Sequence, residues 1–360
     1  MILLNPGPVT LSARVRQALN GPDLCHREPE FAQLQVDIRN RLLGIYDLDP
    51  AVWAAVLLTG SGTAAMEAMV TSLVPNGGRL GVIENGVYGE RLSRIAAIHG
   101  IDSIAFRLAW GDAVDMAALA AWMDANAGLT HLAVVHHETT TGRLNPIAAI
   151  GGLCKARGIA LLVDGVSSFG AEELGFDEWG IAACAATANK CLHGIPGTSF
   201  VITRREALAA PGIVPRTLYL DLGTYCREQD RGGTPFTQSV QSFYALAEAL
   251  AEFADEGGWR ARRARYEALV SQVRNGLKEI GIRPLLPDGA SSVVLNAYHL
   301  PDGMDYERLH DHLKAHGFVI YSGQGDFARS IFRISTMGAI TDTDIERLLA
   351  AFRMLSGQQA

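Results

Sequence analysis

The stretch "IALLVDGVSSFGA", residues 159–171, runs from an apolar segment directly into an acidic side chain, Asp164. A short apolar run that ends in this way is typical of a buried strand in an α/β protein. Similar runs occur on both sides of it, and amphipathic segments such as "GTAAMEAMVTSLV" and "PIAAIGGLCKARG" separate several of them. They are "AAVLL" (54–58), "RLGVI" (79–83), "HLAVV" (131–135), "AACAA" (182–186) and "TSFVI" (198–202). This alternation predicts an α/β fold with a mostly parallel central sheet covered by helices.

A second region begins after the break "DEGG" (255–258). It opens with "WRARRARYEALVSQVRNGLKEIG", which favours a long helix, and then mixes the predicted strands "SSVVLNAYHL" and "FVIYSG" with the predicted helix "DYERLHDHLKAHG". We therefore expect a large domain over residues 15–255 and a smaller α+β C-terminal domain over 256–360. Residues 1–14 are expected to contribute to the cleft that the two domains share.

Composition excludes several functions. A net charge of −7 and a pI of 5.8 do not suit a surface that binds nucleic acid or an anionic membrane. The apolar run at the start of the N-terminal "MILLNPGPVT" is too short for a signal peptide or a membrane span. This favours a cytoplasmic location. Five scattered cysteines without a CxxC pair indicate reduced thiols and no zinc site. The histidines of "HDHLKAH" (310–316) are interpreted as solvated, so no metal is expected.

Ligands of parallel sheets bind at the carboxyl ends of the strands, and here those ends carry reactive side chains. "TGSGTAAMEA" (59–68) follows the first strand, so Ser61, Gly62 and Thr63 can present hydroxyls and backbone N–H groups at a helix N-terminus. This arrangement predicts a phosphate site. The alternative is an ordinary turn in which Thr63 caps the helix.

Three further strand ends continue the pattern. Tyr88, in "ENGVYGER" (84–91), could stack on a flat cofactor or be a core tyrosine. The threonines of "HHETTTGRLNP" (136–146) could bond a ligand or cap the turn. Asp164 needs a positive partner, such as a protonated pyridine nitrogen, because a buried carboxylate is otherwise costly. A helix N-cap or a structural salt bridge is the alternative for Asp164.

The chain has only four lysines, and Lys190 differs from the others. Lys155, Lys278 and Lys314 each stand three residues before a glycine at the end of a predicted helix, where a cation is favourable. Lys190 instead follows a strand in "TANKCLHGIPG" (187–197), at the same edge as Asp164. A desolvated lysine there can act as a nucleophile that forms a Schiff base. A phosphate cradle, a stacking ring, an acid and an amine together predict a pyridoxal 5′-phosphate site.

Eight motifs occur in the order seen in the small-group pyridoxal phosphate aminotransferases of fold type I. The sequence resembles most closely the 2-aminoethylphosphonate:pyruvate aminotransferases, and next the alanine–glyoxylate aminotransferases. The resemblance runs from about residue 3 to residue 340. The motifs are "NPGPV", "HREPEF", "GSGTAAMEA", "NGVYGER", "HHETTTGRLNP", "VDGVSSFG", "ANKCLHGIPG" and "FRISTMG".

The resemblance implies a ping-pong transaminase that moves an amino group between 2-aminoethylphosphonate and pyruvate, and a homodimer with sites at the subunit interface. It implies a role for each matching residue. By this resemblance Lys190 is the Schiff-base lysine and proton carrier, and Asp164 pairs with the pyridinium nitrogen. Ser61, Gly62 and Thr63 hold the phosphate, Tyr88 stacks on the ring, and Thr140 lies near O3′ of the cofactor. Thr237 reaches the phosphate of the partner subunit, and Arg333 holds the acid group of the substrate.

Two departures from the phosphonate pattern keep an alanine/serine–glyoxylate aminotransferase as the alternative. "CHREPEF" (25–31) is closer to the alanine–glyoxylate pattern, and His193 stands where a glutamine is common.

A non-catalytic regulatory protein with the same fold would lose Lys190 or Asp164, and both are present. A cysteine desulfurase needs a cysteine in the small domain, whereas all five precede residue 230. Without the resemblance, Arg333 would be interpreted as a surface ion-pair residue on an edge strand.

Overall fold

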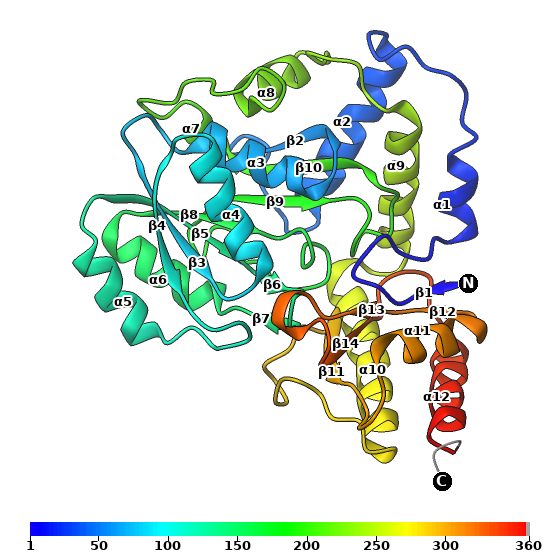
Figure 1. Ribbon diagram of the computed structural model, residues 1–360. Coiled ribbons are helices and arrows are strands. Elements are labelled where there is room, and N and C mark those ends of the chain that lie inside the picture. The colour runs from blue at the N-terminus through cyan, green and yellow to red at the C-terminus, as the bar shows by residue number, and fades with distance from the viewer. Residues whose placement is uncertain (358–360) are drawn as a thin grey trace.

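The computed structural model describes residues 1–357, and its centre is a seven-stranded sheet in the order β2–β10–β9–β8–β5–β3–β4 (Figure 1). The six predicted strands are confirmed, and the α/β fold class with them. The sheet also contains β4 at one edge, which the sequence did not reveal because it is a half-exposed segment. The strands are β2 (Trp53–Gly60), β3 (Arg79–Glu84), β4 (Asp102–Arg107), β5 (Leu129–Val135), β8 (Ala160–Asp164), β9 (Ile181–Thr187) and β10 (Gly197–Arg204).

One strand of this sheet is antiparallel. β10 pairs antiparallel with both β2 and β9, whereas the other neighbours are parallel. The connection from β9 to β10, residues 188–196, holds no helix and is too short for the crossover that a parallel pair needs. It is a tight return at the carboxyl end of β9, and it carries Lys190.

Both faces of the central sheet are covered by helices. On β2, Ala55 and Leu57 join one hydrophobic cluster, while Val56 and Leu58 join the other, as alternation along a strand requires. The first cluster includes side chains of α2 (Pro29–Gly44), α5 (Met116–Ala125), α6 (Ile147–Arg157) and α9 (Val240–Asp255). The second includes side chains of α3 (Gly62–Leu73), α4 (Val87–Ile98) and α8 (Leu222–Asp230). The shorter helices α1 (Ala13–Ala18) and α7 (Arg205–Leu208) lie against α9 and β10.

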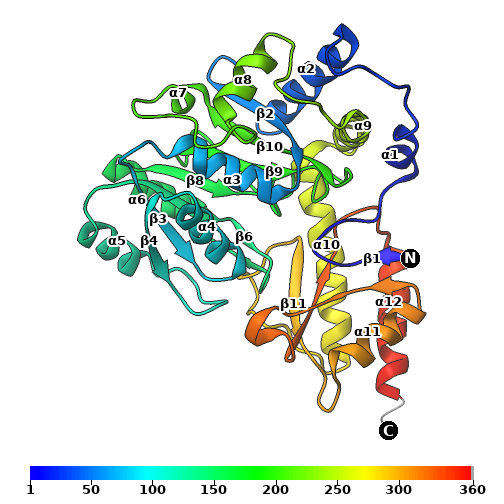
Figure 2. The same cartoon turned by 45° about the horizontal axis from the view of Figure 1, so that its top comes forward.

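The C-terminal part has its own hydrophobic core beside the central sheet (Figures 1 and 2). It contains a three-stranded antiparallel sheet in the order β11–β14–β13. Its elements are α10 (Gly258–Glu279), β11 (Leu295–His299), α11 (Tyr306–Ala315), β13 (Tyr321–Ser322), the 3-10 turn Gly325–Phe327, β14 (Ile331–Ser335) and α12 (Asp342–Gly357). No helix within residues 1–357 is long and apolar enough to cross a membrane.

The predicted strand "FVIYSG" is divided between two sheets. β12 (Phe318–Val319) pairs in parallel with the N-terminal β1 (Ile2–Leu3), whereas β13 pairs with β14. Further hydrogen bonds join Leu4 to β14 and Thr10 to the turn after it. The N-terminus is therefore anchored to the C-terminal part, and Pro6 and Gly7 lie against Lys190 at the end of β9.

Candidate active site

The ends of the strands bring several of the predicted site residues to one edge of the central sheet. Asp164 is the last residue of β8, and Lys190 follows β9. β10 starts at Gly197 opposite Gly60, so the end of β2 reaches the same edge. A short ribbon of β6 (His137–Glu138) and β7 (Arg143–Leu144) follows β5 there.

Lys190 lies in a half-buried position against the N-terminal segment. Its Nζ donates a hydrogen bond to the backbone carbonyl of Pro6, and no carboxylate in the described residues forms an ion pair with it. Desolvation lowers the pKa of Lys190 to about 8, and the positive charges of Arg333 and Arg91 act in the same direction. At pH 7 roughly a tenth of this amine is therefore uncharged, far more than for an ordinary lysine, and the uncharged form is the nucleophile.

Asp164 is 3% exposed and has no cationic partner within residues 1–357. Its Oδ1 accepts a hydrogen bond of 2.9 Å from the backbone N–H of Val166. Burial raises the pKa of Asp164 to about 7, and the negative charge of Glu138 adds to the rise. The structural salt bridge that was the alternative for Asp164 is therefore absent from the described residues. A positively charged ring nitrogen would pair favourably with this carboxylate.

The predicted phosphate loop leads into α3. Ser61, and not Thr63, precedes the helix as its N-cap, and its hydroxyl makes no capping bond. A Cβ on Gly62 would come within 2.8 Å of Val166, so the glycine permits close contact with the segment after Asp164. The backbone N–H groups of the first turn of α3 and the Ser61 hydroxyl suit a phosphate.

Tyr88 and Thr63 are both held by Arg91. Tyr88 is half-buried in the first turn of α4, and the guanidinium carbon of Arg91 lies 4.5 Å from its ring centroid. Arg91 Nη1 also donates to Thr63 Oγ1 at 3.1 Å. The sequence motif "NGVYGER" contains Arg91, but the sequence alone predicts a role only for its tyrosine.

The threonine turn differs from the expectation in detail. Thr140 Oγ1 donates its proton to Glu138 at 2.6 Å and accepts a bond from the N–H of Val87 at 3.1 Å. The hydroxyl of Thr139 is buried without a partner among the described residues. Glu138, fully buried, also accepts from the N–H groups of Tyr88 and Gly89 at 3.2 and 3.3 Å. Glu138 thus fixes the start of α4, a role that its position in a polar turn did not reveal.

Arg333 is buried in the middle strand of the C-terminal sheet, so it is not a surface ion-pair residue on an edge strand. Its Nε donates to the carbonyl of Ser322 at 2.9 Å, and its Nη1 donates to the carbonyl of Thr139 at 2.9 Å and to Gln324 Oε1 at 3.3 Å. No carboxylate pairs with it in the part of the chain that the structure describes. Because a buried charge is costly without a counter-ion, the site suits an anionic ligand.

Thr237 lies apart from this group. Its side chain is exposed, and it has no bond within residues 1–357. Its neighbour Gln238 is bonded to Thr59 Oγ1 at 2.9 Å, close to the phosphate loop of the same chain. The exposed Thr237 hydroxyl is therefore not bonded to any of the other predicted site residues in the part of the chain that the structure describes.

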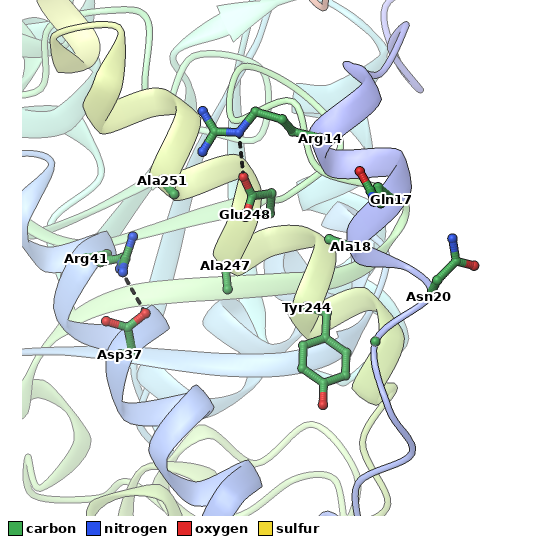
Figure 3. A pocket seen from close by; sticks show the side chains of 11 residues that line it. Arg14, Gln17, Ala18, Asn20, Asp37, Arg41, Tyr244, Ala247, Glu248 and Ala251 are labelled. Carbon is green, nitrogen blue, oxygen red and sulfur yellow. Dashed lines mark hydrogen bonds and ion pairs between the residues drawn. The ribbon is translucent and has the colours of Figure 1, made fainter.

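A cavity of about 660 Å³ lies elsewhere, between α1, α2 and α9 (Figure 3). Its lining includes the ion pairs Arg14–Glu248 and Arg41–Asp37, and none of the predicted site residues. Its opposite charges are already paired. None of the chemistry predicted from the sequence therefore falls in this cavity.

The donor set fits pyridoxal 5′-phosphate. The site offers an amine of lowered pKa, a buried carboxylate without a cation, a helix N-terminus and an unpaired buried hydroxyl. The described residues hold no cluster of three side chains arranged as metal ligands.

The chain is similar to known proteins over nearly its whole length. The profile of the family described as aminotransferase class-V matches residues 51–348. The chain is 35% identical to the 2-aminoethylphosphonate–pyruvate transaminase of Vibrio cholerae, over 98% of this chain and 96% of that protein. It is 37% identical to the enzyme of the same name from Klebsiella pneumoniae, over 97% and 96%. The crystal structure of alanine–glyoxylate aminotransferase from Nostoc superposes with a TM-score of 0.92 at 28% identity, over 98% and 94% of the chains. The fold, the strand-end site and these matches agree, and the chain belongs to the class-V aminotransferase family, whose cofactor is pyridoxal 5′-phosphate.

Proposed function

We propose that the protein transfers the amino group of 2-aminoethylphosphonate to pyruvate, giving phosphonoacetaldehyde and L-alanine. Eight curated relatives at 34–37% identity carry the corresponding name, and they align with nearly the whole chain. The site residues described above support the same chemistry. Pyridoxal phosphate, when bound, supplies an electron sink next to the carbon that loses its proton.

The chain's own residues would divide the work as follows. Lys190 is the covalent anchor and carries the proton between two carbon positions, because its lowered pKa lets it both accept and release one near neutral pH. Asp164 holds the ring nitrogen protonated. The N-terminus of α3 binds the phosphate, and Tyr88 stacks on the ring.

The proposed substrate depends mainly on Arg333. A ping-pong enzyme must bind the carboxylate of pyruvate and the phosphonate of the amino donor in turn, and a buried arginine without a counter-ion can accept both. Gln324 adds donors beside it, because its Oε1 accepts from Arg333 while its amide nitrogen has no partner in the described residues. Extra donors suit a phosphonate, which carries up to two negative charges.

For the cofactor's O3′ we propose Thr139 together with, or in place of, Thr140. The single proton of the Thr140 hydroxyl is directed at Glu138, whereas the Thr139 hydroxyl has no partner. Removing each hydroxyl separately tests the choice. We expect Thr139→Val to weaken cofactor binding more than Thr140→Val does.

We infer a homodimer in which Thr237 reaches the phosphate of the partner's site. Leu218 and Tyr219 are 83% and 41% exposed, and the Tyr219 hydroxyl donates to the carbonyl of Thr59 beside the phosphate loop. Exposed large apolar side chains next to a site favour coverage by a second copy. Residues 15–255 and 256–360 would act as the two domains of each subunit, with residues 1–14 in the cleft. Sedimentation analysis of the wild type and of Leu218→Asp tests the dimer.

The test of the substrate is a donor comparison. The purified holoenzyme is given 2-aminoethylphosphonate, alanine or serine as the donor, each with pyruvate and with glyoxylate. We expect the highest kcat/KM for 2-aminoethylphosphonate with pyruvate. If alanine or serine with glyoxylate is turned over at least ~100-fold more efficiently than any phosphonate pair, a gap of about 2.7 kcal/mol in transition-state binding, the glyoxylate enzyme is the correct assignment.

A further inference from the structure

Arg91 is a charged residue next to the site that none of the assigned roles uses. It lies half-buried in the first turns of α4, and no carboxylate within residues 1–357 forms an ion pair with it. Its guanidinium makes two contacts, with the ring of Tyr88 and with the hydroxyl of Thr63. Both partners are proposed cofactor-binding residues, and they belong to different helices, α4 and α3.

We propose that Arg91 is a positioning residue for the cofactor, which holds the stacking ring of Tyr88 and orients the hydroxyl of Thr63 as a phosphate donor. The inference rests on the proposed function, since it takes the pyridoxal phosphate site as given. It adds a residue that joins the ring-binding and phosphate-binding halves of that site.

The contact with Tyr88 fixes one face of the ring. A guanidinium 4.5 Å from the centroid is within the range of a cation–π interaction. It covers one face, so a flat ligand can stack only on the other. The start of α4 is held separately by Glu138 through the N–H groups of Tyr88 and Gly89. Glu138 thus fixes the backbone at Tyr88, while Arg91 restrains its side chain.

The contact with Thr63 sets the direction of a proton. A threonine hydroxyl has one proton to donate and can accept two bonds. Arg91 has no acceptor and therefore donates to Thr63 Oγ1 at 3.1 Å, which leaves the hydroxyl proton for a further acceptor. No other bond to this oxygen occurs within residues 1–357. A phosphate oxygen at the N-terminus of α3 would be that acceptor.

The charge of Arg91 also acts on both central residues. It lowers the pKa of Asp164 and that of Lys190, and so favours the ionised carboxylate and the neutral amine. Both effects are in the direction that cofactor binding requires. A positive charge that is not cancelled by a paired carboxylate suits this function.

The test measures the dissociation constant of pyridoxal phosphate on apoenzyme, by quenching of intrinsic fluorescence, together with the visible circular dichroism of the saturated protein. Arg91→Gln is expected to weaken binding at least ~10-fold, about 1.4 kcal/mol, and to reduce the dichroic band, with the apoenzyme melting temperature unchanged. Arg91→Lys retains the charge but not the planar guanidinium. Its dissociation constant for pyridoxal phosphate should lie between the values of the wild type and Arg91→Gln. Arg94→Gln is the matched control, because Arg94 is exposed on the same helix and has no partner in the described residues.

A double-mutant cycle with Thr63→Val isolates the orientation of the hydroxyl. The two losses should be non-additive, because each variant removes the same donor arrangement. Binding by Arg91→Gln within twofold of wild type, or strict additivity with Thr63→Val, overturns the proposal. If Arg91→Gln does not fold, Arg91→Met is judged by the same thresholds. Wild-type protein that binds no pyridoxal phosphate overturns the proposed function as well, whereas normal wild-type binding with an unaffected Arg91 variant overturns this inference alone.

Discussion

Gly7 lies against the side chain of Lys190 without room for any further atom. A Cβ at position 7 would lie 2.7 Å from Cδ and 2.9 Å from Nζ of the lysine, and the glycine has a φ of +108°, which L-residues rarely adopt. β1 anchors this segment to the C-terminal part through its pairing with β12. The N-terminal segment is therefore a wall of the site that leaves Lys190 just enough space.

Gly7→Ala should displace this wall and lower kcat/KM at least ~100-fold, because small displacements of a catalytic group are costly. Gly100→Ala is the matched control. Gly100 also has a positive φ, but nothing lies within 4 Å of its added Cβ. Steady-state kinetics of both variants make the comparison. Activity of Gly7→Ala within threefold of the Gly100→Ala value would show that the close approach has no functional importance.

Glu138→Gln should loosen the start of α4. The amide would direct an NH₂ group at donors that the carboxylate now accepts, the N–H groups of Tyr88 and Gly89 and the hydroxyl of Thr140. A loss of about 1–3 kcal/mol in the free energy of unfolding is expected, with weaker cofactor binding. Urea denaturation of the apoenzyme measures the first quantity. Glu267→Gln, an exposed change on α10, should leave it unaltered, and an equal effect of the two variants would contradict the account.

Asp164→Asn should fold and bind the cofactor but lose most of its turnover. A neutral amide cannot keep the ring nitrogen protonated, so the electron sink is weakened. Single-turnover measurement of the first half-reaction should show a rate lower by at least ~100-fold. Rates close to wild type would mean that Asp164 is only structural.

The apoenzyme should show a particular dependence of stability on pH. The folded-state pKa of Asp164 is raised to about 7, so its ionisation costs stability as pH rises through the interval between 3.8 and 7. The folded-state pKa of Lys190 is lowered to about 8, so stability returns as pH rises from about 8 towards 10.5. The combined cost is greatest near pH 7–8. The variant Asp164→Asn/Lys190→Met should exceed wild-type apoenzyme in melting temperature most clearly there, and a constant difference from pH 5 to 9.5 would refute the two shifts.

The sequence predicts the central sheet well because its strands are apolar runs with polar ends. Alternation alone does not give the direction of β10, since it does not encode pairing. The link through Lys190 is too short for a crossover, however, and this sequence feature indicates the antiparallel pairing of β9 and β10. β4 was missed because an exposed edge strand lacks a continuous apolar run. The division of "FVIYSG" depends on pairing with the distant N-terminus, which no local pattern contains.

The site was predicted in part for a related reason. Lys190, Asp164 and the α3 turn follow strands, and that position can be recognised from sequence. Arg91 and Glu138 act through other residues, so their importance appears only when Tyr88, Thr63 and Thr140 are placed around them. The choice between Thr139 and Thr140 depends on which hydroxyl Glu138 uses, and this is set by the fold of the turn.

The most direct test of the account is to locate the covalent bond to the cofactor. Holoenzyme is reduced with borohydride, digested, and analysed by mass spectrometry for the pyridoxyl adduct. The chain has three other lysines, Lys155, Lys278 and Lys314, which serve as internal controls. We predict stoichiometric modification of the peptide that contains Lys190, and none of it in Lys190→Ala. An adduct on another lysine, or no adduct on protein that has bound the cofactor, would contradict the central claim that Lys190 is the covalent anchor.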